Sequence, residues 1–174
     1  MSNTPGMAGS TPSPQATRRE ILAWALYDFA NSGYTTVVLT TVFSAYFVAV
    51  VAGSAAQVSM GTATLLWTLG ISAANLIVLL AAPVVGATAD HLAAKKRFLL
   101  ATTAGCVIAT ALLSMVGPGD IAAGLALLVV SAVCFALGES LIAAFLPEIA
   151  PAERMGRISA YGWSLGYIGG LFTL

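Results

Sequence analysis

Apolar runs separated by short polar connections occupy the chain from Ile21 onward. A helix needs about 20 apolar residues, rising ~1.5 Å each, to cross the ~30 Å hydrocarbon core of a bilayer. Four runs reach or approach that length, and a fifth continues for 17 residues to the last residue given. The pattern predicts an all-α membrane protein with spans at residues 33–52, 62–86, 98–116, 121–146 and 158–174.

The stretch before the first span combines apolar and polar residues. The apolar run begins at Ile21, but Asp28 and Asn31 interrupt it before residue 33. We therefore expect this stretch to lie at one membrane face or to pack against protein. Residues 1–17 are mostly Ser, Thr, Pro, Gly and Ala with few apolar neighbours, and they are expected to form a disordered cytoplasmic tail.

The composition identifies lipid as the solvent for which this chain is built. Hydrophobic residues make up 59% of it and charged residues 8%, whereas about 25% of the residues in a soluble domain are charged. The formal net charge is zero, which gives no reason to expect nucleic acid as a partner. Cys106 and Cys134 lie in apolar runs and His91 is the single histidine, so neither a metal site nor a cofactor is expected.

The cations lie on one side of the predicted topology. All seven lysines and arginines fall before the first span, between the second and third, or between the fourth and fifth. Residues 53–61 and 117–120, which connect the other spans, contain none. Because cytoplasmic loops carry an excess of Lys and Arg, the N-terminus and the connection after the second span are expected in the cytoplasm.

The connection after the second span carries a charged motif, GATADHLAAKKR, over residues 86–97. Gly86 ends the apolar run, Asp90 follows one turn later, and Lys95 opens a basic cluster. Taken alone, the motif is also explained as an ordinary charged turn whose cations anchor the next helix at the lipid headgroups.

Gly86-x-x-x-Asp90 followed by basic residues, between the second and third spans, resembles the signature loop of the major facilitator superfamily. His91 stands where that family usually has Arg or Lys, Ala93 where it has Gly, and Ala94 where it has a cation.

Two longer blocks look like the branch of that superfamily named after the fungal vacuolar amino-acid effluxer, which has many bacterial members. The first is AWALYDFANS at residues 23–32. The second is LPEIAPAERMGR at residues 146–157, which leads into SAYGW at residues 159–163. The resemblance covers about residues 20–174.

This resemblance implies a twelve-helix transporter built of two six-helix halves, with the substrate path between them. The chain would then be the N-terminal part of such a protein, without its C-terminal half, and is not expected to transport alone. The resemblance also implies a bacterial-type cell membrane, and efflux of an amino acid or another small solute. The residues expected at a cytoplasmic gate are Gly86, Asp90, Lys95, Arg154 and Arg157.

Glu139 is the strongest candidate for a coupling or substrate residue. Counted back from Leu146, it lies about 10 Å inside the end of the fourth span. A charge inside a span costs about 2.5–3.5 kcal/mol on insertion scales, so its default interpretation is functional. Proton carrying or substrate contact is one interpretation, and a structural hydrogen bond to a neighbouring helix is the other.

Three more polar residues are candidates for the substrate path. Asp28 and Asn31 share a helix face, although Asp28 could instead be solvated or paired with Arg18 or Arg19. Asn75 lies in the middle of the second span, where a single amide more often joins helices than binds a solute.

Gly162, Gly166 and Gly170 recur at every fourth position of the fifth span. Small residues at this spacing allow two helices to approach closely. Helix packing is therefore the expected role, and a gating hinge is the alternative.

The leading hypothesis is a secondary active transporter that works by alternating access. The sequence contains no phosphate-binding loop of the Gly-x-x-x-x-Gly-Lys type, so we expect an ion gradient to supply the energy, with protons carried by a carboxylate such as Glu139. A non-transporting membrane scaffold or regulatory protein is the alternative. An enzyme is disfavoured, because no pair of reactive groups converges at a suitable spacing.

The predicted topology can be tested by cysteine labelling in intact cells. Cysteine introduced at Ser59 should react with a membrane-impermeant thiol reagent added outside, whereas cysteine at Ala94 should not. The unsubstituted chain, whose two cysteines lie in apolar runs, is the control. Faster labelling at position 94 would show that the orientation is inverted.

Overall fold

The computed structural model describes residues 17–174, and this part of the chain is helical, without strands. The tail expected over residues 1–17 lies outside the described residues except for Thr17. Thr17 begins the first helix with a capping box. The Glu20 N–H donates to the Thr17 hydroxyl, and the Thr17 N–H donates to the Glu20 carboxylate over 2.7 Å.

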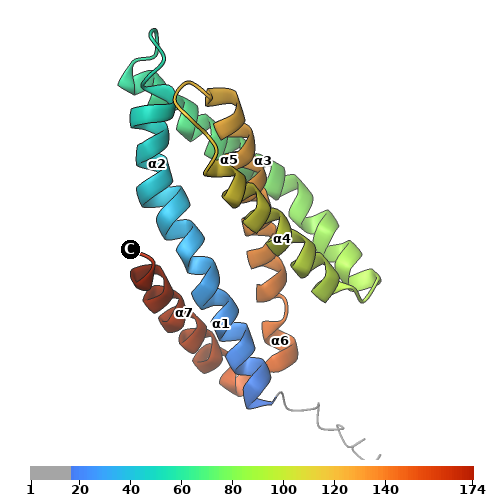
Figure 1. The fold of residues 1–174 in the computed structure, drawn as a ribbon. Coiled ribbons are helices and arrows are strands. Elements are labelled where there is room, and N and C mark those ends of the chain that lie inside the picture. Colours follow the sequence, from blue (N-terminus) through green and yellow to red (C-terminus); the bar gives the residue numbers. More distant parts are fainter. Residues whose placement is uncertain (1–16) are drawn as a thin grey trace, which may run out of the picture.

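The first helix is a continuous segment of 35 residues that runs the height of the bundle (Figure 1). It consists of α1 (Arg18–Tyr34), the π-helical segment η1 (Thr35–Thr41), α2 (Val42–Tyr46) and the π-helical segment η2 (Phe47–Ala52). In η1 the Thr40 hydroxyl donates to the carbonyls of Thr35 and Thr36, at 3.0 and 2.9 Å. Such bonds satisfy the polar groups of an irregular turn where lipid offers no partner.

Among residues 17–174, four helical segments are long and apolar enough to cross a membrane: Arg18–Ala52, Met60–His91, Lys95–Leu113 and Ile121–Ile149. The elements after the first helix are α3 (Met60–His91), α4 (Lys95–Leu113), α5 (Ile121–Ala143), α6 (Leu146–Ile149), the 3-10 turn η3 (Ala152–Arg154) and α7 (Met155–Phe172). The prediction of an all-α membrane protein is confirmed. The fourth membrane-crossing segment continues past residue 146 to Ile149. It is divided into α5, which ends at Ala143, and α6, where Pro147 lies in the first turn and no N–H is required.

Helix α5 holds the bundle together, because it contacts α3, α4 and η2. Leu128 and Ser131 on α5 are fully buried. The Ser131 hydroxyl lies 2.8 Å from that of Tyr34 on α1, and the Tyr34 ring stacks on Phe135 with 4.8 Å between centroids. Large hydrophobic side chains are exposed elsewhere on the helices, as lipid contact requires.

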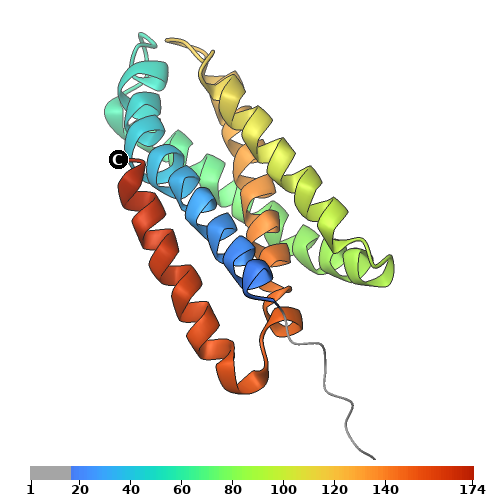
Figure 2. The same cartoon turned by 60° about the horizontal axis from the view of Figure 1, so that its bottom comes forward.

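Helix α7 runs in the same direction as α1 and lies beside its lower half in both views (Figures 1 and 2). Its contact face is made of glycines. Gly162 faces the Trp24 ring, Gly166 faces Asp28 and Ser32, and Gly170 faces the Thr36 hydroxyl. Without side chains on this face, α7 leaves room for the polar side chains of α1.

Among the described glycines of α7, Gly169 approaches the α1 backbone most closely, and it lies outside the series of glycines singled out in the sequence. A Cβ atom at this position would overlap the carbonyl oxygen of Phe29. The α1 backbone therefore occupies the space that any side chain at position 169 would need, as in other close helix pairs in membranes.

Gly169→Ala should destabilise the protein, because the added methyl group would overlap the Phe29 carbonyl oxygen. Overpacking of this kind costs about 1–3 kcal/mol and would lower the midpoint of thermal unfolding in detergent. Gly156→Ala is the matched control on the same helix, since a Cβ there meets nothing within 4 Å and alanine favours helix. A Gly169→Ala protein as stable as the Gly156→Ala control would contradict the observed packing.

Candidate functional site

A cavity of about 550 Å³ lies between α1, the start of η1, α5 and α7. Its volume falls in the range of sites that bind small molecules. The polar and aromatic residues that line it are Asp28, Ser32, Thr35, Thr36, Glu139, Trp163 and Tyr167, and the glycines are Gly166 and Gly170.

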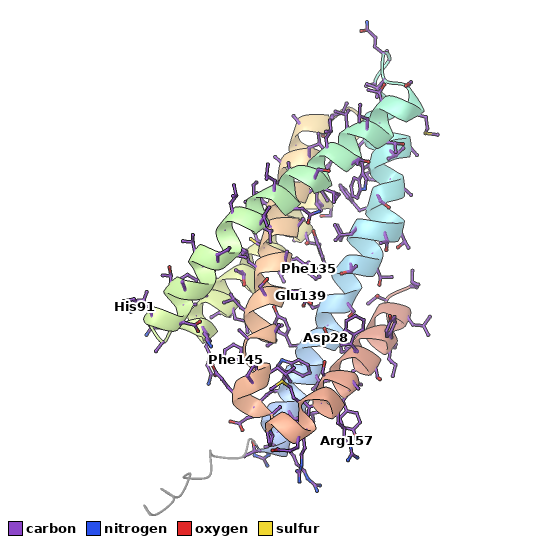
Figure 3. All side chains as sticks on the ribbon, turned by 180° about the vertical axis from the view of Figure 1, so that it is seen from behind. Asp28, His91, Phe135, Glu139, Phe145 and Arg157 are labelled. Atoms are coloured by element: carbon purple, nitrogen blue, oxygen red, sulfur yellow. The ribbon has the colours of Figure 1, made fainter. Side chains whose placement is uncertain are left out.

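Two carboxylates from different helices face this cavity, Asp28 from α1 and Glu139 from α5. Figure 3 shows them close together between α1, α5 and α7. The Asn31 amide nitrogen donates to Glu139 Oε1 over 2.5 Å. The structure thus brings together Asp28, Asn31 and Glu139, which the sequence singled out separately.

Neither carboxylate of the cavity has a cation beside it in the described part of the chain. The ion pairs found between residues 17 and 174 both belong to Lys95. Pairing of Asp28 with Arg18 or Arg19, an alternative left open by the sequence, is not observed among these residues. Carboxylates inside a span are costly when no cation lies beside them, so Asp28 and Glu139 are the least compensated charges of this site.

The hydroxyl groups on the α1 wall turn their protons toward the backbone. The Ser32 hydroxyl donates to the Asp28 carbonyl over 2.9 Å, and the Thr36 hydroxyl donates to the Ser32 carbonyl over 3.0 Å. With the proton engaged, each oxygen keeps lone pairs that accept hydrogen bonds. This wall therefore offers acceptors to whatever enters the cavity.

The α7 wall is aromatic. Trp163 and Tyr167 lie one turn apart, with 6.2 Å between ring centroids, and both are largely exposed. Trp163 and Tyr167 were not selected as site residues from the sequence, and neither were Ser32 and Thr36. The four-residue spacing of Trp163 and Tyr167, next to the glycines of α7, is the signal that could have identified this aromatic wall.

Two further polar contacts fix α1 against its neighbours on either side of this site. The Trp24 indole N–H donates to the Ile142 carbonyl on α5 over 3.0 Å. The hydroxyls of Tyr27 on α1 and Thr103 on α4 lie 3.0 Å apart. These contacts orient the α1 face on which Asp28 lies.

The α3–α4 hairpin holds a separate charged cluster. Lys95 Nζ lies 2.8 Å from Asp90 Oδ1 and 2.5 Å from Glu148 Oε1, so one lysine joins the hairpin to the segment after α5. Gly86, Asp90 and Lys95 also line a small cavity of about 130 Å³. Ala93 has a left-handed φ of 48°, the conformation that favours the glycine usual there in the family the loop resembles.

The remaining candidates of the sequence analysis lie outside both clusters. Arg157 donates from Nε to the Tyr161 hydroxyl over 2.9 Å, and it lies toward the lower end of α7 in Figure 3. Arg154 is exposed after the 3-10 turn, and Asn75 is exposed on α3. Glu148, which pairs with Lys95, was not among the residues selected from the sequence.

Among residues 17–174 no group of three His, Cys, Asp or Glu side chains is arranged to hold a metal ion. Cys106 is buried and Cys134 partly buried.

Comparison with known proteins agrees with this architecture. A chain of Bacillus subtilis (strain 168), described as the uncharacterized MFS-type transporter YxiO, is 35% identical over 147 residues. The alignment covers 84% of this chain and 34% of that relative, so the chain spans about a third of the length of the relative. No solved structure matches. The family model described as "Vacuole effluxer Atg22 like" matches residues 48–155, more than half of the chain; this integral membrane chain therefore belongs to that family of the major facilitator superfamily.

Proposed function

We propose that the complete protein is a secondary active transporter and that the cavity between α1, α5 and α7 is part of its solute path. The observation that carries this proposal is the pair of membrane-embedded carboxylates, Asp28 and Glu139, facing a cavity without a fixed cation. A purely structural role would favour full pairing, since exposed charge in lipid is costly.

Glu139 is proposed as the proton-carrying group. Its side chain reaches the cavity, and Asn31 donates to only one of its oxygens, so the other can accept a proton from a side to which the cavity opens. Protonation would remove the negative charge of Glu139 and so lower the free-energy cost of moving the surrounding helices within the membrane. Alternating exposure of such a group to the two sides couples proton flow to solute movement.

The Asp90–Lys95–Glu148 cluster is proposed as the gate on the cytoplasmic side. Three charged side chains from the hairpin and the post-α5 segment meet there, and their separation would open the space between α3, α4 and α5. The proposed orientation, with the N-terminus and this hairpin in the cytoplasm, rests on the one-sided cations. The proposed solute is small, an amino acid or a similar compound.

Glu139→Gln tests the coupling role, because glutamine keeps the volume and can bond with Asn31 but cannot release a proton. In proteoliposomes with the complete transporter, the substitution should abolish solute accumulation driven by a pH gradient. The protein yield should be unchanged, and exchange of solute across the membrane without a gradient should remain possible. Glu153→Gln is the control, since Glu153 is exposed on η3.

Uphill transport by Glu139→Gln at the wild-type rate and with the wild-type pH dependence would overturn this assignment. Glu139 would then be structural, and Asp28, the other carboxylate of the cavity, would be the next coupling candidate.

A further inference from the structure

We propose that Asn31 is a positioning residue that transmits the charge state of Glu139 to α1, so that proton uptake by Glu139 loosens the contact between α1 and α5. This inference rests on the proposed function and deepens it, because it says how a proton bound in the cavity changes the contact between two helices that wall it. Its basis is the hydrogen bond from the Asn31 amide to Glu139 Oε1.

One face of α1 carries a row of side chains that bond to neighbouring helices. Residues 24, 27, 31 and 34 are spaced by three, four and three positions, so they lie on the same side of the helix. One partner belongs to α4 and the others to α5. The bonded pairs are Trp24–Ile142, Tyr27–Thr103, Asn31–Glu139 and Tyr34–Ser131. This row of four pairs joins α1 to α4 and α5.

Glu139 is the only member of the four pairs that has a carboxyl group. The other members bond through an indole N–H, a backbone carbonyl, an amide or a hydroxyl. Tyrosine hydroxyls have an ordinary pKa of about 10 and stay protonated near neutral pH. A change of charge within the row near neutral pH therefore occurs at Glu139.

The other titratable groups around Glu139 come from α1 and α7. On α1, Asp28 and Tyr27 lie near it, and Tyr167 of α7 lines the same cavity. Cys106 of α4 lies near Tyr27, whereas α3 and η2 contribute no residue to the cavity lining. Asp28 is a like charge that acts on Glu139 through space and is outside the row of pairs.

The contact between Asn31 and Glu139 is stronger when Glu139 is ionised. A carboxylate only accepts hydrogen bonds, and the amide N–H donates to it. Hydrogen bonds to a charged acceptor are roughly twice as strong as bonds between neutral groups. A proton that arrives from the cavity binds the second oxygen, and Oε1 then accepts from Asn31 as the carbonyl oxygen of a neutral acid. Proton uptake therefore weakens this contact without breaking it.

Asn31 acts through Glu139 and not on the solute. Its neighbours on α1, Asp28 and Ser32, line the cavity, whereas Asn31 is partly buried and is not among the described lining residues. Glu139 both accepts from Asn31 and lines the cavity. A proton bound from the cavity is thus felt at α1 through this carboxyl group.

Thermal unfolding of the full-length protein in detergent, measured as a function of pH, tests the proposal without a solute. Asn31→Leu keeps the branched shape of the side chain but removes the donor. The substitution should lower the unfolding midpoint about twice as much at high pH, where Glu139 is ionised, as at low pH, where it is protonated. Tyr34→Phe is the matched control, because it removes a hydroxyl bonded to the uncharged Ser131, and its effect should not vary with pH.

Glu139→Gln supplies the second arm of this test, because glutamine is neutral at every pH and its carbonyl can accept from Asn31. In the Glu139→Gln background, the effect of Asn31→Leu should no longer depend on pH. An equal effect of Asn31→Leu at high and low pH in the wild-type background would contradict the proposal. A pH-dependent effect that persists in the Glu139→Gln background would also contradict it. If Asn31→Leu does not fold, Asn31→Ala is measured in its place with the same expected results.

Infrared titration of the carboxyl C=O stretch separates this inference from the proposed function. The band that is lost in Glu139→Gln reports the protonated form of Glu139. A band that does not change with pH would reject Glu139 as the proton-carrying group, and this inference with it. A band that titrates, while Asn31→Leu has the same effect at every pH, would sustain the proton-carrying group and reject the role of Asn31.

Discussion

Lipid provides no hydrogen-bond partners, and this constraint determines how nearly every polar group within the bundle is placed. Ser32, Thr36 and Thr40 return their hydroxyl protons to backbone carbonyls of the same helix. Other polar groups pair between helices, as Asn31 does with Glu139 on α5. The carboxylate of Asp28 and the second oxygen of Glu139 differ from these paired groups, because they face a cavity and have no cation beside them among the described residues. We therefore propose a function for the two groups whose charge is not compensated.

The glycine face of α7 is the second requirement of the site. With no side chain at positions 166 and 170, the space beside Asp28, Ser32 and Thr36 stays open although the helices nearly touch at Gly169. Close packing and an open cavity therefore have the same cause. The aromatic residues of α7, Trp163 and Tyr167, lie next to these glycines in sequence and form part of the cavity lining.

Hydropathy predicted much of the fold, because the four membrane-crossing segments of the described residues are long apolar runs. It also indicated Glu139 as a candidate site residue, because a carboxylate in such a run is costly. The contacts between elements could not be predicted in the same way. Nothing in one sequence shows that residue 31 reaches residue 139, because that pairing depends on how α1 is rotated against α5. Likewise, the link from Lys95 to Glu148 depends on where the chain turns after α5, and the π-helical turns of the first helix have no periodic signature.

The central claim is that Asp28 and Glu139 share a cavity in which a mobile cation neutralises them. Dicyclohexylcarbodiimide, an apolar reagent that modifies carboxyl groups shielded from water, tests it most directly when its adducts are mapped by mass spectrometry. Adducts are expected at Glu139 or Asp28 and not at the exposed Glu153. Absence of adducts at both cavity carboxylates would contradict the claim.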